Sequence, residues 1–385
     1  GDVLTWSIAS SPVQGTLSGS GATWTYTPNL AWAGTDEFTF TVSDGTGTSP
    51  VTTATIIVAS TGPWQLIART GHTAPGAAGA VFSAFQTDYV SDAAGRASFR
   101  ATAGSVTGIW TEGPAGLEAV AVQNAAAPAV SGAFFDSFTT GPWAAGDGEL
   151  LVFGKLRTGT GGVTTSNDLG YWHRSNGAAA LVARENDAVP GMAAAARFNV
   201  LSAVATLEAG GNYAFAGSMK TNSSLAITNA NDTGLWATFG APARLLVREN
   251  QAAPGSADGG LFDTLTSAVL VSNGAGQLGF STSMKTGGNI TTTNRYGLWM
   301  WDPAQFGLVA RSGNAAPGTP TGALLGQPLQ PSFGDGAMAF RSALGTGSGG
   351  VTNSNETGLW VLENGVVNLL AREGFPAPGV VPGGL

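Results

Sequence analysis

The amino-acid sequence predicts an all-β protein that consists mostly of a tandem repeat. Three observations support this fold class: an eleven-residue string recurs along the chain, short runs alternate apolar and polar residues, and charged residues are scarce. Only 10% of the 385 residues are charged, against about 25% in an average globular protein, and 58 residues are glycine. This composition favours short strands joined by tight turns over long helices.

The repeat is clearest in strings that end in Ala-Pro-Gly or a variant of it. "LVARENDAVPG" begins at Leu181 and "LLVRENQAAPG" at Leu245, with further copies from Leu66, Leu308 and Leu369 and a degenerate copy over residues 119–130. Aligned on the proline, one column reads Arg69, Val122, Arg184, Arg248, Arg311 and Arg372, in steps of 53, 62, 64, 63 and 61 residues. Twelve residues before each member after the first lies a tryptophan column: Trp110, Trp172, Trp236, Trp299 and Trp360.

Each repeat is expected to hold four strands. In the repeat after Pro254 these are residues 265–272, 277–285, 296–302 and 306–311, and an Asn-Gly turn joins the first two. A sheet of this size cannot bury both faces alone, so neighbouring repeats must stack. A β-propeller blade fits best, and a linear β-solenoid is the alternative. At least five complete blades are expected, preceded by one strand at residues 64–69 that is equivalent to a fourth strand.

Residues 1–60 differ from the rest and form a separate predicted domain. Residues 22–28, 36–45 and 52–58 alternate apolar and polar residues and end in turn formers, as sandwich strands do. The string "GTLSGSGATWTYTPN...AGTDEFTFTVSDGTG" resembles the Ig-like and cadherin-like tandem domains of large bacterial surface proteins. The resemblance implies two or three more strands before residue 1, and therefore an incomplete N-terminus.

Residues 61–385 are predicted to be the propeller domain. The turns that end at Phe99, Phe215, Phe280 and Phe340 are close to a pattern N-x-x-G-x-x-A-F. This pattern resembles bacterial tandem-repeat surface proteins, which are expected to be β-propellers. The last residues match the middle of an earlier linker, so the C-terminus is also expected to be incomplete. An intact ring would have six or more blades, unless five close by themselves.

Composition excludes several partners and chemistries. A formal net charge of -8 argues against nucleic acid and anionic membranes as partners. The sequence has no cysteine, so it has neither disulfides nor thiolate chemistry. No apolar run is long enough to span a membrane, and any secretion signal is expected to lie outside this sequence.

The two columns have structural and functional interpretations. Five arginines at one repeat position could form an anion-binding ring, but we expect them to lie between blades and donate to carbonyls or carboxylates of a neighbouring repeat. The tryptophans could be a sugar-stacking platform, but we expect them to fill the core. Lys220 and Lys285 share one position and are expected to protect sheet edges. Both columns are therefore assigned structural roles.

Catalysis and metal binding have little support in the sequence. The two histidines, His72 and His173, fall at different repeat positions, which argues against a histidine-based triad or zinc site. Loops such as "TTSND" and "TNAND" offer oxygens for Ca²⁺, but too few carboxylates, and Asn and Thr turns explain them. We therefore expect no cofactor, no catalytic residue and no enzyme. The irregular second repeat, with Asp136, Trp143, Asp147 and Glu149, is the one place for a hidden site.

The sequence favours a structural or adhesive protein of the bacterial surface, located outside the cell. Its expected partners are other surface or matrix components, copies of itself, or a glycan. The alternative function is a carbohydrate-binding propeller with exposed aromatics on one rim. A third is an extracellular hydrolase or lyase that loses activity when Asp147 or Glu149 is changed. Fold alone does not choose among these functions.

Overall fold

The computed structural model describes residues 3–29, 34–58, 66–92, 94–113, 116–239, 242–334, 336–347 and 349–376. Over these residues the protein is all-β, as predicted. Its only helices there are two single-turn 3-10 helices, η1 (Gly146–Gly148) and η2 (Ser223–Leu225). No helix in this part of the chain is long and apolar enough to span a membrane.

The chain divides into two compact units. The N-terminal unit comprises Gly1–Thr87 and Arg96–Val122, and the C-terminal unit comprises Asp88–Gly95 and Gln123–Leu385. The N-terminal unit thus joins the predicted first domain to part of the first repeat. The predicted domain boundary at residue 60 lies outside the described residues and stays a prediction.

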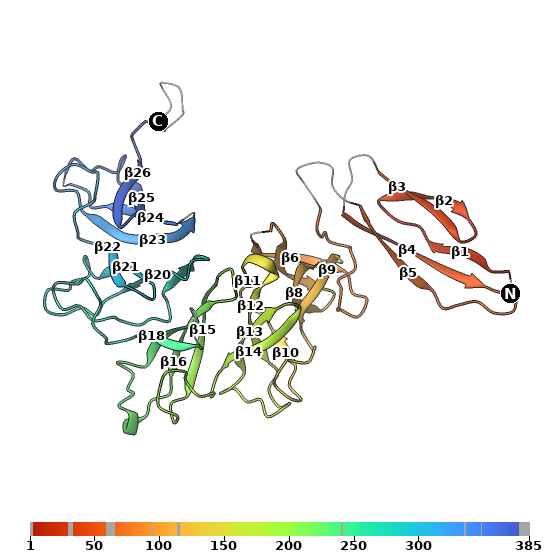
Figure 1. The fold of residues 1–385 in the computed structure, drawn as a ribbon, viewed down its shortest axis with the longest axis horizontal. Coiled ribbons are helices and arrows are strands. Elements are labelled where there is room, and N and C mark those ends of the chain that lie inside the picture. Colours follow the sequence, from red (N-terminus) through yellow and green to blue (C-terminus); the bar gives the residue numbers. More distant parts are fainter. Residues whose placement is uncertain are drawn as a thin grey trace. The chain divides into compact units, whose positions relative to one another are not determined.

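Two small antiparallel sheets begin the N-terminal unit (Figure 1). One has the order β1 (Thr5–Ser10), β4 (Gly34–Ser43), β5 (Thr52–Val58), and the other is the hairpin of β2 (Gly15–Ser20) and β3 (Thr23–Pro28). Strands were predicted at residues 22–28, 36–45 and 52–58, which agrees with β3, β4 and β5 to within two residues. Whether this region is Ig-like stays a prediction.

Five further sheets follow, each with a path of four strands in chain order (Figure 1). Repeat sheet 1 contains β6 (Phe82–Ser91), β7 (Ala97–Ala103), β8 (Val106–Gly113) and β9 (Gly116–Val122). Repeat sheet 2 contains β10 (Phe135–Ser137), β12 (Leu150–Leu156), β13 (Leu169–Ser175) and β14 (Ala178–Arg184), with β11 (Trp143–Ala144) also paired to β12. Repeat sheet 3 contains β15 (Phe198–Leu207), β16 (Tyr213–Met219), β17 (Thr233–Ala237) and β18 (Arg244–Arg248). Repeat sheet 4 contains β19 (Val269–Ser272), β20 (Leu278–Ser283), β21 (Tyr296–Trp301) and β22 (Phe306–Arg311). Repeat sheet 5 contains β23 (Leu325–Gly334), β24 (Ala337–Leu344), β25 (Thr357–Glu363) and β26 (Val366–Arg372).

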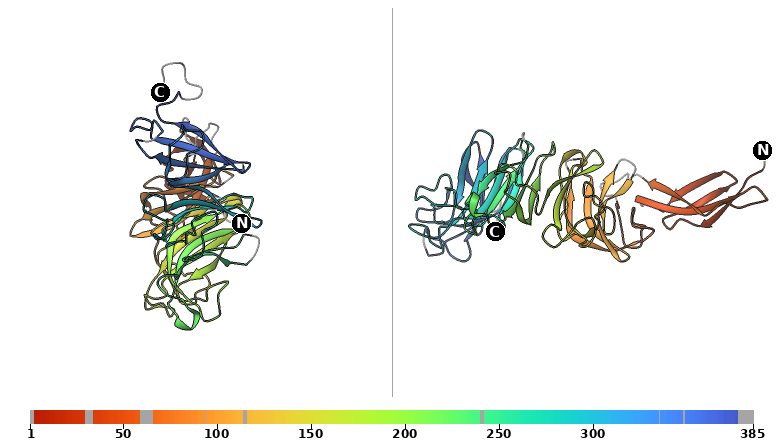
Figure 2. Two further views of the ribbon diagram at one scale, coloured as in Figure 1. Left: turned by 90° about the vertical axis from the view of Figure 1, so that its left-hand side faces the viewer. Right: turned by 90° about the horizontal axis from the view of Figure 1, so that it is seen from below.

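Within the C-terminal unit, consecutive sheets stack on one another (Figure 2). The first strands of neighbouring sheets lie side by side, β15 against β19 and β19 against β23. Blades of a β-propeller place their first strands together in the same way. The unit is therefore a β-propeller-like series of sheets, and the number of blades in an intact ring stays a prediction.

Two expectations about strands need correction. Of the strand expected at residues 64–69, the described residues 66–69 belong to no strand, and residues 64 and 65 lie outside the described part. Each repeat sheet already has its own fourth strand, so these residues find no third strand to pair with. The first strand of sheet 4 begins at Val269 rather than at residue 265, because Leu265 leaves the ladder to pack into the core.

The "GLW" signature has a local steric cause. The indole of Trp299 lies back over Gly297, two residues earlier on the same face of β21. A Cβ atom at Gly297 would lie 2.4 Å from the indole ring. The other four tryptophans of the column lie over a glycine in the same way, at Gly108, Gly170, Gly234 and Gly358. Glycine at this position therefore makes room for the tryptophan.

Candidate functional site

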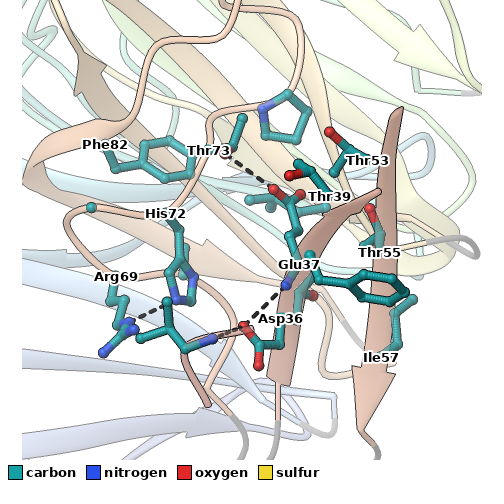
Figure 3. A pocket seen from close by; sticks show the side chains of 18 of the residues that line it. Asp36, Glu37, Thr39, Thr53, Thr55, Ile57, Arg69, His72, Thr73 and Phe82 are labelled. Atoms are coloured by element: carbon teal, nitrogen blue, oxygen red, sulfur yellow. Dashed lines mark hydrogen bonds between the residues drawn. The ribbon is translucent and has the colours of Figure 1, made fainter. Parts of the chain in front are cut away.

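A cleft of about 770 Å³ opens in the N-terminal unit, between the sheet of β1, β4 and β5 and the segment around residues 67–75 (Figure 3). The register between β4 and β5 places polar residues side by side along one wall. Glu37 pairs with Thr55, and Thr39 pairs with Thr53. Because alternate residues of a strand share a face, these side chains form a polar row. Seven of the lining residues carry a hydroxyl group: Ser10, Ser11, Thr35, Thr39, Thr53, Thr55 and Thr73.

Asp36 at the base of this cleft has a structural role. One of its carboxylate oxygens accepts from the backbone N–H groups of Val13 and Glu37, at 3.1 and 3.0 Å. The other accepts from the N–H of Gln14 at 2.8 Å and from the Tyr26 hydroxyl at 2.9 Å. Desolvation of Tyr26, followed by this bond, raises the pKa of the phenol well above its usual range. The carboxylate therefore holds the β2–β3 hairpin against β4.

Two groups on the opposite wall set the electrostatics of the cleft. Arg69 Nε donates to His72 Nε2 at 2.6 Å, so this imidazole nitrogen is an acceptor. Burial, and then the positive charge of Arg69, lower the pKa of His72, which is therefore neutral at pH 7. Glu37 projects into the cleft and its Oε2 accepts from the Thr73 hydroxyl at 3.2 Å (Figure 3). Arg69 is thus the member of the arginine column that lines this cleft.

The other four arginines of the column connect the end of the fourth strand to the loop before the third strand of the same repeat. Each Nε donates to the backbone carbonyl of an asparagine seventeen residues earlier, at 2.6–2.7 Å: Arg184 to Asn167, Arg248 to Asn231, Arg311 to Asn294 and Arg372 to Asn355. Each asparagine in turn accepts at Oδ1 from the backbone of a threonine three residues earlier. The expectation of bonds to a neighbouring repeat was wrong, because the third and fourth strands of one sheet bring both groups together.

The five tryptophans are buried, with 0–2% of their surface exposed. In four repeats the indole N–H donates to the carbonyl of the proline that opens the same repeat, at 2.9–3.0 Å: Trp110 to Pro75, Trp172 to Pro128, Trp299 to Pro254 and Trp360 to Pro317. Trp236 has no such acceptor for its Nε1. In these four repeats the tryptophan therefore connects the entry of the repeat to its third strand.

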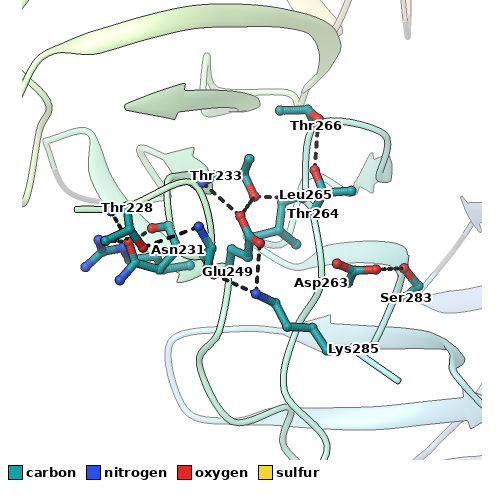
Figure 4. A network of polar contacts seen from close by, with 12 residues as sticks. Thr228, Asn231, Thr233, Glu249, Asp263, Thr264, Leu265, Thr266, Ser283 and Lys285 are labelled. Atoms are coloured by element: carbon teal, nitrogen blue, oxygen red, sulfur yellow. Dashed lines mark hydrogen bonds and ion pairs between the residues drawn. The ribbon is translucent and has the colours of Figure 1, made fainter. Parts of the chain in front are cut away.

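Basic residues after the second strand connect one sheet to the preceding one. Lys285 contacts Glu249 Oε1 at 3.0 Å and donates to the carbonyl of Ala230 at 2.6 Å (Figure 4). The same carboxylate accepts from the Thr233 hydroxyl, which accepts from the N–H of Leu265. At the equivalent position, Lys220 donates to Asn186 Oδ1 at 2.8 Å. These lysines therefore bond to the neighbouring sheet, whereas the sequence suggested only protection of edges.

Repeat sheet 2 contains an acid–base pair that the other repeats lack. Glu149 Oε2 lies 2.5 Å from His173 Nε2, and Glu149 Oε1 accepts from the Ser175 hydroxyl at 2.6 Å. Gly211 packs so closely against the pair that a side chain at this position would have no room. At the two equivalent positions the other repeats carry Arg96 and Thr111, Asn212 and Ala237, Gln277 and Met300, and Ala337 and Val361. The sequence had singled out Glu149 but not its partner. The side chain of Asp147 lies outside the described part.

Metal binding finds no support in this geometry. The residues that the structure describes contain no group of three or more His, Cys, Asp or Glu side chains that could hold a metal ion. The Thr and Asn loops before "GLW", considered for Ca²⁺, are closed by their own hydrogen bonds. Asn294 Nδ2, for example, donates to the carbonyl of Asn289 at 3.0 Å.

The fold and the recurring hydrogen bonds of the column arginines and tryptophans define an all-β tandem-repeat protein. The chain belongs to the family of unknown function DUF7453, whose model matches residues 9–242 and 227–384. No curated protein matches it.

Among solved structures, the chain is similar to three enzymes or enzyme domains. The first is the β-propeller domain of the Trilobed protease from Pyrococcus furiosus, with 9% identity, a TM-score of 0.38, and coverage of 98% of this chain and 95% of that one. The second is a puromycin hydrolase variant, with 11% identity, a TM-score of 0.31, and coverage of 90% and 54%. The third is a thermostable family-43 glycoside hydrolase, with 12% identity, a TM-score of 0.30, and coverage of 80% and 98%.

These similarities contradict the expectation that the chain is not an enzyme, because the three structures come from a protease, a puromycin hydrolase and a glycoside hydrolase. The sequence argument considered histidines only by their place in the repeat, so it did not find the acidic neighbour of His173. His173 finds its acidic partner 24 residues away, across β12 and β13. At these low TM-scores, no activity or residue role is transferred from those enzymes to this chain.

Proposed function

We propose that this chain is an adhesive protein of the bacterial cell surface that binds carbohydrate in the cleft of its N-terminal unit. The observation that carries the proposal is the polar row of Glu37, Thr55, Thr39 and Thr53 along one wall of a cavity of about 770 Å³. This volume is in the range of small-molecule sites.

The groups of the cleft suit a neutral or basic sugar. Threonine hydroxyls both donate and accept, as the hydroxyls of a sugar do, and an ionised carboxylate accepts two hydrogen bonds at once. Ile57, Leu117 and Val13 supply apolar contacts for the C–H faces of a ring. Acidic sugars are disfavoured, because two carboxylates, those of Asp36 and Glu37, line the cleft against the single guanidinium of Arg69, and the formal net charge is -8.

Calorimetric titration with a panel of neutral, basic and acidic oligosaccharides tests this function. We expect saturable binding of a neutral or basic sugar. Glu37→Gln, which keeps the shape and removes the charge, should weaken it roughly 10-fold to 100-fold, because bonds to a charged group contribute about 1.5–3 kcal/mol. Thr55→Val should weaken it about five-fold.

The matched control is Glu363→Gln, at the end of β25 and outside the cleft, which should leave binding unchanged. If no sugar binds with a Kd below about 1 mM, or if Glu37→Gln and Glu363→Gln behave alike, the proposed function is wrong.

A hydrolase is the second candidate, and the pair of Glu149 and His173 favours it. His173 Nε2 lies 2.5 Å from Glu149 Oε2, and a proton shared between these two atoms would orient the imidazole and leave Nδ1 to take a proton from water or a substrate hydroxyl. Ser175 bonds to the carboxylate and not to the imidazole, so it positions Glu149 and is not an activated nucleophile. Screening with chromogenic esters and glycosides tests this candidate. Activity lost in His173→Asn and kept in His72→Asn would support it.

A further inference from the structure

Four ionisable side chains line the cleft of the N-terminal unit within the described residues. Asp36 and Glu37 lie on β4, and Arg69 and His72 lie on the opposite segment (Figure 3). The guanidinium is positive and the two carboxylates are negative. His72 is the group of the four that ordinarily changes its charge between pH 5 and pH 8. The charge that a bound sugar meets therefore depends on this imidazole.

The surroundings of His72 favour a neutral imidazole at pH 7. Its Nε2 accepts from Arg69 Nε at 2.6 Å, and a protonated imidazole has no acceptor to offer. Partial burial and the positive charge of Arg69 lower the pKa of His72, while Asp36 and Glu37 act in the opposite direction. Protonation therefore breaks the hydrogen bond with Arg69, and it requires a pH below the ordinary histidine pKa of 6.5.

Arg69 stays in the cleft when this hydrogen bond breaks. Its Nη1 lies 3.0 Å from the side-chain oxygen of Gln14, with the amide oriented to accept. The backbone N–H of Gln14 in turn donates to Asp36 at 2.8 Å. The guanidinium is thus held at its other end, so protonation of His72 adds a second positive charge and does not replace the first.

The balance of charge in the cleft therefore differs between pH 7 and pH 5. At pH 7 two carboxylates face one guanidinium, which leaves an excess of one negative charge. Once His72 is protonated, two cations face the two carboxylates. A carboxylate on a sugar is repelled in the first state, and in the second state it can pair with the imidazolium.

We propose that His72 sets the charge selectivity of the cleft. With a neutral imidazole the cleft takes neutral sugars and excludes acidic ones, and with a protonated imidazole it also takes sugars that carry a carboxylate. This inference rests on the proposed function, because it names the sugars that the same cleft accepts. By linkage, a bound acidic sugar also strengthens the binding of the proton to His72.

Calorimetric titration at pH 7.5 and pH 5 with a matched pair of ligands tests the proposal. The pair is a neutral oligosaccharide that binds to the cleft and the same oligosaccharide oxidised at C6 to the uronic acid. We expect the Kd of the acidic sugar, relative to that of the neutral sugar, to fall about five-fold between pH 7.5 and pH 5. The carboxyl group of the sugar is ionised at both pH values, so this change arises in the protein.

Two substitutions at His72 separate its charge from its shape. His72→Gln keeps an oxygen that can accept from Arg69 and is neutral at both pH values, so the relative Kd should no longer change with pH. His72→Lys is positive at both, so its relative Kd at pH 7.5 should already match that of the natural sequence at pH 5. The matched control is His173→Gln, which removes the other histidine of the chain, outside the cleft, and should keep the pH dependence.

Nuclear magnetic resonance of the His72 imidazole tests the geometry without any sugar. The chain has two histidines, so His173→Gln leaves a single imidazole to follow. We expect this imidazole to titrate below pH 6.5. Arg69→Met should raise its pKa, because the substitution removes both a positive charge and the donor that stabilises the neutral form.

Three results would overturn the proposal. The first is binding of the neutral sugar with a relative Kd that is the same at both pH values. The second is a pH dependence that survives His72→Gln. The third is an imidazole whose pKa is not lowered and does not respond to Arg69→Met. If no sugar binds at either pH, the proposed function is wrong and this proposal falls with it, whereas in the first result the neutral sugar binds and the proposed function stands.

Discussion

Repeat sheets 2 and 4 share one framework but differ in their charges. In both, the column tryptophan bonds to the proline that opens the repeat, and the column arginine bonds to an asparagine carbonyl. Sheet 2 adds the pair of Glu149 and His173, where sheet 4 has the neutral Gln277 and Met300. Features common to the repeats therefore explain stability, and the departures of one repeat are where chemistry should be sought.

Removal of the column tryptophan should have the largest effect on stability, and this effect should be equal in the two sheets. Trp172→Ala and Trp299→Ala each remove a fully buried indole and leave a cavity beside a glycine that cannot fill it. We expect each to lower the free energy of unfolding by about 3–5 kcal/mol, measured by denaturant titration. A much smaller loss in sheet 2 would show that its irregular first strands relax to fill the space.

The column arginines should contribute unequally to stability in the two sheets. Arg311 also holds Asp258 through both carboxylate oxygens, at 2.9 and 2.7 Å, whereas Arg184 has no partner for Nη2 in the described part of the chain. Arg311→Met should therefore cost about 2–3 kcal/mol and Arg184→Met about 1 kcal/mol, by the same titration. Equal costs would indicate that the contact with Asp258 adds nothing.

A smaller difference should isolate the indole hydrogen bond. Trp299→Phe loses both ring volume and the bond to Pro254, whereas Trp236→Phe loses volume alone, since the described part of the chain gives Trp236 Nε1 no acceptor. We expect Trp299→Phe to be the costlier change by about 1 kcal/mol. The reverse order would mean that the bond to proline does not stabilise the repeat.

The smallest expected effect concerns pH. Burial raises the pKa of Glu185, which follows Arg184, while sheet 4 has the neutral Ser312 at this place. A raised pKa means that the folded state binds the proton more tightly than the unfolded state. This group therefore opposes folding at pH 7 and ceases to do so as pH falls through its raised pKa.

Glu185→Gln should stabilise the protein at pH 7 and reduce the rise in stability between pH 7 and pH 5, measured as Tm across that range. Ser312→Ala is the control, and should leave the pH dependence unchanged. A decline in the stability of the natural sequence over this range, unaffected by Glu185→Gln, would contradict the assignment.

The sequence predicted the structural features that recur in every repeat and missed those that occur only once. The strands of sheet 4 and the positions of Trp299 and Arg311 followed from spacing, because each depends on residues close by in the chain. The cleft joins Glu37 to Thr73 and Arg69 to His72 across a segment with no periodic pattern, so no local signal marked it. The partner of Glu149 was missed for the same reason, although a charged residue at a place occupied elsewhere by Asn212 and Gln277 was a usable signal.

The hydrogen bonds within each repeat bear on how the number of repeats can change during evolution. Pro254, Asp258, Asn294, Trp299 and Arg311 all lie within one stretch of the chain, and they bond to each other. A duplicated segment of about 62 residues therefore inherits this set of partners, and only the contacts between sheets, such as that of Lys285 with Glu249, depend on its neighbours. Gain or loss of whole segments by unequal recombination should leave these bonds intact in every remaining segment, so chains of different length can arise in single genetic steps.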